Sequence, residues 1–263
     1  MSRGGGGGDG ANRVLRGPFR CGALILGWAL AMALCILWID RPLAWVFRRR
    51  TFFFDGLASW ITHAGDSLWV LSAAALGGLL GLLAQRLAAA PAMRAQAQRL
   101  SLACAFVFIS VASSGVLVNG LKYVFGRARF NALMLRGEYG FYFFQGGYDF
   151  SSFPSGHANT ALALAVALAC LWPRGRRLFL LAGVLLASSR VVLTAHYLSD
   201  ALAGGALGAW TTRLWWRWFT RRYALLRPAG PAGDTAGADQ CVAEDGGGVS
   251  SARSWPTSTA SKR

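Results

Sequence analysis

Acidic residues are scarce in this chain. Among 263 residues there are 11 aspartates and glutamates against 27 lysines and arginines, and charged residues make up only 14%. A soluble domain usually carries about a quarter charged residues. So basic a chain first indicates nucleic acid binding, but here the arginines stand beside long apolar runs, where anionic lipid headgroups and membrane topology explain them better. We therefore expect a membrane protein with no nucleic acid partner.

Cysteine is also sparse. The five cysteines form an odd number, no CxxC spacing occurs, and four of them lie in or beside apolar runs. This pattern predicts neither a disulfide framework nor a zinc site. No cluster of carboxylates is present that would hold a hard cation. We expect no metal and no other cofactor.

Long apolar runs dominate the rest of the sequence. Each approaches the roughly 20 residues that cross a bilayer as a helix. The first run follows a basic segment but exceeds the roughly 7 to 15 apolar residues of a signal peptide, so we expect it to be retained. The runs cover residues 21–39, 68–84, 100–118, 156–172, 178–193 and 198–219. The sequence thus predicts an all-α fold, a bundle of six transmembrane helices within residues 21–222, with disordered tails at 1–20 and 228–263.

The basic residues predict an orientation. Six spans place both termini on one side, and the segments on that side carry 15 lysines and arginines against 8 on the other. The positive-inside rule makes the termini cytoplasmic. The loops at 40–67, 119–155 and 194–197 then face outward, and the composition suggests a bacterial inner membrane.

Ionisable residues at membrane depth are functional candidates because they are costly to bury. The first cluster holds Lys122, Arg127 and Arg129, with no acid nearby in the sequence. Unpaired cations favour an anion, and arginine matches the geometry of phosphate oxygens. A basic anchor at the membrane surface is the alternative.

The second cluster is the segment Phe153-Pro154-Ser155-Gly156-His157, directly before the fourth apolar run. Ser155 can cap the helix, and Gly156 lets an anion approach the free N–H groups of the first turn. His157 would then lie beside that anion. An ordinary helix start with an incidental histidine is the alternative.

The third cluster runs from Ser189 and Arg190 to His196 and Asp200. His196 and Asp200 are four residues apart, so one helical turn would place them on one face. A carboxylate on one imidazole nitrogen leaves the other free to attack. A structural His–Asp pair beside a snorkelling arginine is the alternative. The third histidine, His63, is expected at the surface.

Together the three clusters resemble the motifs of the type 2 phosphatidic acid phosphatase family, which is grouped with the vanadium-dependent haloperoxidases. Lys122 and Arg129 match a Lys, six residues, Arg-Pro motif, and 154–157 match Pro-Ser-Gly-His. The third motif, Ser-Arg, five residues, His, three residues, Asp, is matched through Asp200. The resemblance covers about residues 60 to 220. Phe130 stands where the family has proline, which puts the geometry of the following loop in question.

The resemblance implies a metal-independent phosphatase. His196 would attack phosphorus to form a phosphohistidine, Asp200 would orient it, and His157 would protonate the leaving alkoxide. The phosphoryl oxygens would be held by Lys122, Arg129, Ser155, Gly156 and Arg190. The implied substrate is a lipid phosphate or pyrophosphate in the membrane, with no obligatory protein partner. Phosphatidic acid, phosphatidylglycerol phosphate, an isoprenyl pyrophosphate and a lipid A phosphate all fit.

Aromatic residues crowd the segment 130–153, and a second aromatic stretch lies at 51–60. Aromatic side chains favour the membrane interface, so we hypothesise that they line a lipid entrance; simple anchoring is the alternative. Two other functions stay open. One is a phosphotransferase that passes the phosphoryl group to an alcohol, and the other is a non-catalytic anion-binding membrane protein.

Overall fold

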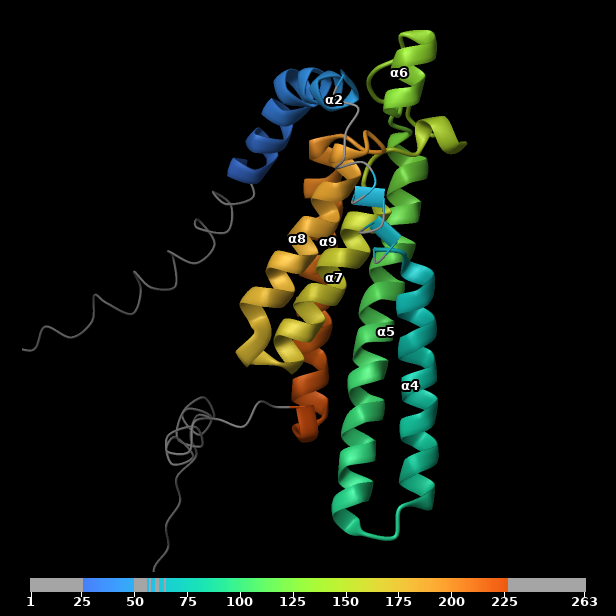
Figure 1. Cartoon of the computed structure of the whole chain (residues 1–263), viewed down its shortest axis with the longest axis vertical. Helices are drawn as coiled ribbons and strands as arrows, with labels where there is room; N and C mark the ends of the chain where they lie inside the picture. The colour runs from blue at the N-terminus through green and yellow to red at the C-terminus, as the bar shows by residue number, and fades with distance from the viewer. Residues whose placement is uncertain (1–25, 50–55, 57, 60–61, 64, 227–263) are drawn as a thin grey trace, which may run out of the picture. The chain divides into compact units, whose positions relative to one another are not determined.

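The computed structural model describes residues 26–49, 56, 58–59, 62–63 and 65–226. The predicted disordered tails and most of the aromatic stretch at 51–60 lie outside these residues. Every named element in the described part is helical (Figure 1). The elements are a helix over Leu26–Arg49, which contains η1 (Cys35–Ile39) and α2 (Asp40–Arg49), then α4 (Ser67–Leu87), α5 (Pro91–Phe125), α6 (Phe130–Arg136), η2 (Tyr148–Phe150), α7 (Gly156–Leu171), η3 (Pro173–Gly175), α8 (Arg176–Val192), α9 (Leu198–Arg222) and η4 (Ala224–Leu226).

Three of these helices are long and apolar enough to cross a membrane. They are Leu26–Arg49, Ser67–Leu87 and Pro91–Phe125, and Gly156–Leu171 is a shorter apolar helix. The expected all-α fold is therefore confirmed. The expected boundaries are partly wrong, because α5 continues to Phe125 through polar residues that end the apolar run. Lys122 consequently lies in the last turn of α5 and not in the loop after it.

The helix α7 is the centre of the bundle. It packs against α5, α8 and α9, and its buried face is built mainly from alanine. Small side chains allow neighbouring backbones to approach closely in lipid. Its end is also as expected, because Pro173 follows the last helical turn and cannot continue it.

The helix α9 approaches the start of α7 through glycines. A Cβ atom at Gly204 would lie 3.1 Å from the carbonyl carbon of Ser155 and closer still to its oxygen, and one at Gly208 would clash with the backbone of Asn159. Glycines inside an apolar run are typical of such close helix contacts. This close approach brings the first turn of α7 against the first turns of α9.

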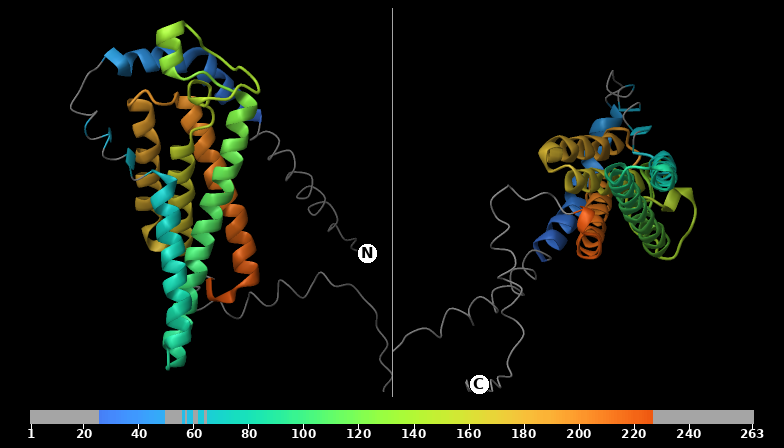
Figure 2. Two further views of the ribbon diagram at one scale, coloured as in Figure 1. Left: turned by 90° about the vertical axis from the view of Figure 1, so that its right-hand side faces the viewer. Right: turned by 90° about the horizontal axis from the view of Figure 1, so that it is seen from below.

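The first helix does not run alongside the others over its whole length. It contains a π-helical turn, η1, and α2 then lies across the end of the bundle near α6 (Figures 1 and 2). Asp40 begins α2 and is fully buried, whereas Arg48 and Arg49 in its last turn are exposed. A helix with one buried face and one charged face suits a membrane interface.

The segment 130–153, expected as an aromatic loop, contains the helix α6 and the short helix η2. Part of its aromatic content is packing within the protein: Phe130 is 2% exposed, and Tyr139 packs on Tyr197 with ring centroids 5.5 Å apart. Phe143, Phe144 and Tyr148 remain more than half exposed. The lipid-entrance hypothesis therefore applies to these exposed side chains alone.

Candidate active site

His196 lies in the turn between α8 and α9 and is 4% exposed. Its backbone N–H donates to the carbonyl of Arg190 at 3.2 Å, which closes the turn. The ring nitrogen Nδ1 is 2.8 Å from the carbonyl oxygen of Ser152. Because a carbonyl can only accept, Nδ1 carries the proton and the lone pair of the neutral ring is on Nε2. The turn thus fixes the ring in the tautomer that a nucleophile needs.

Asp200 stands behind His196 rather than in direct hydrogen bond with it. Its Oδ2 atom is 3.7 Å from Nδ1 of His196. That oxygen accepts from the hydroxyl of Ser152 and from the backbone N–H of Tyr197, the latter at 2.9 Å. The predicted proximity of His196 and Asp200 is confirmed. The carbonyl of Ser152, rather than this carboxylate, is the nearest hydrogen-bond partner of Nδ1.

The surroundings of His196 favour its neutral form. Burial lowers the pKa of the His196 imidazole, Asp200 opposes this change, and the cations of Arg129 and Lys122 lower the pKa further. A lowered pKa means that the ring is already neutral at a pH where an ordinary histidine is still protonated. Its Nε2 lone pair is therefore available over a wider range of pH.

The first turn of α7 forms a second wall of the site. Ser155 is fully buried and caps the helix, its hydroxyl oxygen accepting from the N–H of Ala158 at 3.4 Å. Its own N–H donates to the carbonyl of Asp200 at 2.9 Å, so α7 and α9 are tied together at this point. A Cβ at Gly156 would lie 3.6 Å from Nζ of Lys122. The N-terminus of α7 and the lysine thus face the same small volume.

His157 belongs to the same cluster. Its imidazole lies within the electrostatic influence of Arg190, His196, Asp66 and Lys122. Its ring also lies beside Gly65, where a Cβ atom would be 3.6 Å from Cδ2. The two histidines of the predicted site therefore belong to one cluster, whereas His63 is exposed as expected and donates from Nδ1 to the carbonyl of Ser59 at 2.7 Å.

Two arginines complete the cluster. Arg190 donates from Nη1 to the hydroxyl of Thr62 at 2.9 Å. Arg129 donates weakly to the carbonyls of Ala195 and Ser151, at 3.4 and 3.3 Å, and its guanidinium stacks 4.1 Å above the ring of Tyr148. All these partners are neutral, so the contacts orient the guanidinium groups without cancelling their charge.

The central electrostatic feature of the site is this lack of compensation. Within the described residues, Lys122, Arg129 and Arg190 have no carboxylate within ion-pair distance. They nevertheless act on one another, since Arg129 and Arg190 both lie in electrostatic range of Lys122. Burying like charges side by side is costly without an anion between them. The arrangement therefore suits a multiply charged anion such as phosphate.

Arg127 does not belong to this anion site, although the sequence placed it in the same cation cluster. It is fully buried and forms ion pairs with Asp200 and with Asp40, the latter at 2.8 Å. Burial alone would lower the pKa of Arg127, but the two carboxylates raise it above its ordinary value. The expectation that Arg127 is an unpaired cation is wrong. Asp40 is 87 residues away in the sequence, but the fold places it next to Arg127.

Sequence reasoning also missed Ser152 and Asp40. Nothing in the sequence marks Ser152, because its carbonyl and hydroxyl reach His196 and Asp200 only once the loop has folded. Asp40 did carry a signal, since it is an acid directly at the end of the first apolar run, and such residues are functional candidates.

Phe130, which stands in place of the family proline, is the first residue of α6. Arg129 is the cap of that helix, and Phe130 packs edge-on against Trp45 with ring centroids 5.4 Å apart. Proline is tolerated at a first helical position, so the backbone path is one that proline also permits. Compared with proline, phenylalanine lacks the rigid backbone ring but contacts α2 through Trp45. Arg129 stays in the cluster.

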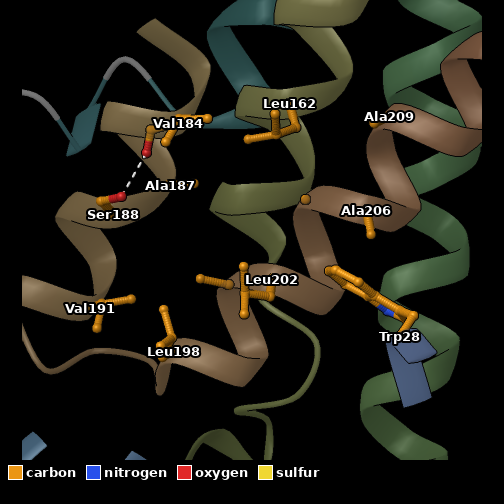
Figure 3. A pocket seen from close by; sticks show the side chains of 12 residues that line it. Trp28, Leu162, Val184, Ala187, Ser188, Val191, Leu198, Leu202, Ala206 and Ala209 are labelled. Atoms are coloured by element: carbon orange, nitrogen blue, oxygen red, sulfur yellow. Dashed lines mark hydrogen bonds between the residues drawn. The ribbon is translucent and has the colours of Figure 1, made fainter. Parts of the chain in front are cut away.

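A separate apolar cavity of about 260 Å³ lies between α7, α8, α9 and Trp28 of the first helix (Figure 3). Ser188 is a polar residue of its lining, and its hydroxyl donates to the carbonyl of Val184 at 2.8 Å. No charged side chain lines the cavity. It cannot bind phosphate and is distinct from the cation cluster.

The fold and the cluster define a helical membrane protein with an anion site around a buried histidine. Comparison with known proteins agrees. Residues 103–224 match the model of the PAP2 superfamily. The chain is 36% identical over 197 residues, 75% of its length and 84% of the relative's, to a lipid A 1-phosphatase from Rhizobium etli. It is 39% identical over 158 residues, 60% of its length and 65% of the relative's, to one from Rhizobium johnstonii.

A solved structure also aligns, the first transmembrane PAP2 type phosphatidylglycerolphosphate phosphatase from Bacillus subtilis. The alignment covers 76% of this chain and 95% of the other, at 21% identity and a TM-score of 0.49. The relatives at 36% and 39% identity establish that the chain belongs to the PAP2 superfamily. It is a membrane phosphatase of that type, and the resemblance stated from its motifs is confirmed.

Proposed function

We propose that this protein hydrolyses the phosphate ester of a membrane lipid, and that the 1-phosphate of lipid A is its substrate. The observation that carries the activity is the group of three uncompensated cations, Lys122, Arg129 and Arg190, around the buried His196. The choice of substrate rests on the names of the two relatives, both lipid A 1-phosphatases.

The reaction proceeds in two steps. The Nε2 lone pair of His196 attacks phosphorus, a bond forms between them, and the bond from phosphorus to the lipid oxygen breaks. His157 gives a proton to the departing alkoxide. Water then attacks the phosphohistidine while His157 takes one of its protons, and inorganic phosphate leaves with His196 restored. Phosphoryl transfer depends mainly on position and charge stabilisation.

The phosphate binders supply that stabilisation. The three cations surround the equatorial oxygens, and the N–H of Gly156 in the first turn of α7, beside the cap Ser155, adds the positive end of the helix dipole. Asp200 and the carbonyl of Ser152 stabilise the positive charge that develops on the ring of His196. These groups take the electrostatic role that a metal ion fills in other phosphatases.

Phosphate release from a panel of lipids in detergent tests the proposal. The panel contains lipid A, phosphatidic acid, phosphatidylglycerol phosphate and an isoprenyl pyrophosphate. We expect lipid A to lose its 1-phosphate fastest, with release that persists when a chelator is added. Arg190→Gln is expected to reduce kcat/KM by about 10²- to 10³-fold, because one charged donor to the transition state is lost.

The matched control is Arg136→Gln. Arg136 is an exposed arginine already paired with Glu138 and Asp149, so its loss should leave release unchanged. Faster release from another lipid would overturn the substrate assignment. Transfer of phosphate to an added alcohol in preference to water would show a phosphotransferase, and no release from any lipid would favour an anion-binding protein.

We also propose that the bundle has six transmembrane helices, with both termini cytoplasmic and the site on the outer face. The helices α7, α8 and α9 are shorter or less apolar than the three long spans, but α7 and α9 run alongside α5, and α8 runs alongside α7 (Figure 2). The surplus of arginine at the turns away from the site supports this orientation. Reporter fusions after Ala90 and after Gly137 test it: activity of a periplasmic reporter is expected only at Gly137, and the reverse pattern would contradict the orientation.

The exposed aromatic side chains of the segment after α6 are the candidate lipid entrance. Phe143 and Phe144 are 61% and 64% exposed. Replacing both with alanine is expected to lower turnover of the lipid several-fold, because aromatic rings anchor at headgroup depth, while a small soluble phosphate ester reacts as before. Trp172→Ala is the control, since Trp172 is 66% exposed at the opposite end of α7. Equal losses on lipid and soluble substrates would contradict the entrance.

A further inference from the structure

A buried chain of charges connects the first helix to the back of the nucleophile. Asp40, Arg127 and Asp200 have fully buried side chains. Nη2 of Arg127 donates to Oδ2 of Asp40 at 2.8 Å, and Nη1 donates to Oδ1 of Asp200. The other oxygen of Asp200 faces Nδ1 of His196 at 3.7 Å. One guanidinium is therefore shared between two carboxylates, of which only one is next to the reacting histidine.

Asp40 also holds the first turn of α9 directly. Its Oδ1 accepts from the backbone N–H of Ser199 at 3.1 Å, and its Oδ2 accepts from the hydroxyl of the same serine. Ser199 in turn accepts from Arg127 at 2.6 Å. The residue after Ser199 is Asp200, so the position of that carboxylate is fixed from the first helix both through the backbone and through the guanidinium.

Aromatic rings close this network off from water. The guanidinium of Arg127 lies 4.7 Å from the ring centre of Tyr197, 5.1 Å from that of Phe141 and 5.8 Å from that of Tyr139. The hydroxyl of Tyr139 donates to the carbonyl of Ile36, one turn before Asp40. In such surroundings a charge interacts strongly with its neighbours, because little solvent screens it.

The sharing has an electrostatic consequence for the reaction. A pair made of Arg127 and Asp200 alone would have no net charge. The trio of Asp40, Arg127 and Asp200 instead carries one net negative charge. When Nε2 of His196 bonds to phosphorus, the ring becomes cationic with its proton on Nδ1. A net negative charge behind Nδ1 stabilises this form.

We propose that Asp40 is a positioning residue for His196, acting through Arg127 and Asp200 from the first helix. This inference rests on the proposed role of His196 as nucleophile. Asp40 touches neither the substrate nor the reacting atoms. It sets the place of Asp200 and the share of the Arg127 charge that Asp200 receives.

The test compares Asp40→Asn with the intact protein in two measurements. In detergent, kcat is expected to fall by roughly 10- to 100-fold, as for a small misplacement of a reacting group, while KM changes less than about threefold because the phosphate binders are untouched. Independently of activity, the nitrogen-15 resonances of the His196 ring are expected to move. The chain has only three histidines, so the His63→Gln and His157→Gln variants assign them.

The direction of the resonance shift follows from charge. Removing a negative charge disfavours the protonated ring, so the pKa of His196 falls, and in a pH titration its ring resonances change at a lower pH in the variant than in the intact protein. The other charged groups that face the ring are the same in both proteins; they are Lys122, Arg129, His157 and Asp200.

Two further variants make the result decisive. Glu138→Gln removes a carboxylate from an exposed ion pair and should change neither measurement. Arg127→Lys keeps the charge but cannot bridge both carboxylates, so kcat should fall as in Asp40→Asn. The proposal is overturned if Asp40→Asn has the same His196 spectrum and the same kcat as Glu138→Gln. If the intact protein releases no phosphate, the proposed function fails, and the His196 spectra alone decide the positioning role.

Discussion

Replacement of His196 by alanine is expected to lower phosphate release by at least about 10⁴-fold, the loss that follows removal of a nucleophile from a preorganised site. The reason is geometric. Nδ1 of His196 is held by the carbonyl of Ser152 at 2.8 Å, so its lone pair is on Nε2. His63 also bonds to a carbonyl through Nδ1, but it is exposed, whereas His196 is buried. The measurement is kcat/KM with lipid A in detergent.

A second measurement follows the covalent labelling of the protein by radioactive phosphate from the substrate. The intact chain should carry an acid-labile, base-stable label, which is typical of phosphohistidine, and His196→Ala should carry none. His63→Ala is the matched control, because His63 is an exposed histidine and its loss should leave release and label unchanged. Release that persists in His196→Ala would remove this residue from the role of nucleophile.

Replacement of Gly204 by alanine is expected to lower both stability and activity, although this residue carries no chemistry. The added methyl group would overlap the carbonyl oxygen of Ser155. The backbone fixes the position of a Cβ atom, and its partner is a backbone oxygen, so neither can rotate away. Overpacking of this kind costs about 1 to 3 kcal/mol. The displaced Ser155 is the cap of α7, so we also expect about 10²-fold slower phosphate release.

Gly115→Ala is the control for this substitution. Gly115 is also a helical glycine, but a Cβ atom there would meet no other atom within 4 Å. Alanine is preferred over glycine in a helix by about 0.5 to 1 kcal/mol, so the midpoint of thermal unfolding should stay the same or rise. Wild-type stability and activity in Gly204→Ala would show that α7 and α9 do not approach as closely as described.

The two substitutions illustrate which parts of the site were predictable. His157, His196 and Arg190 could be found in the sequence because a charged group inside an apolar run is costly to bury and seldom occurs without a role. The glycines of α9 could also be recognised as a packing surface. Even the departure at Phe130 could be located, although its contact with Trp45 of α2 could not.

Helix boundaries and partners were harder. The third apolar run ended at residue 118, whereas α5 continues to Phe125, because backbone hydrogen bonding extends a helix past the point where lipid requires apolar side chains. The sequence also grouped Arg127 with Lys122 and Arg129 as three free cations. The structure separates them, since Arg127 alone meets carboxylates.

The sequence by itself determined that this protein is an all-α membrane phosphatase of the PAP2 type, and it singled out the cations and histidines that we propose carry the phosphate chemistry, because these follow from residue type, spacing and the cost of charge in lipid. Only the tertiary structure decided which cations stay uncompensated and what holds the nucleophile. Those properties depend on residues such as Asp40, Ser152 and Thr62, which are distant or unremarkable in the sequence. Short-range electrostatics and hydrogen bonds act over a few ångströms of space, and the folded chain alone sets those distances.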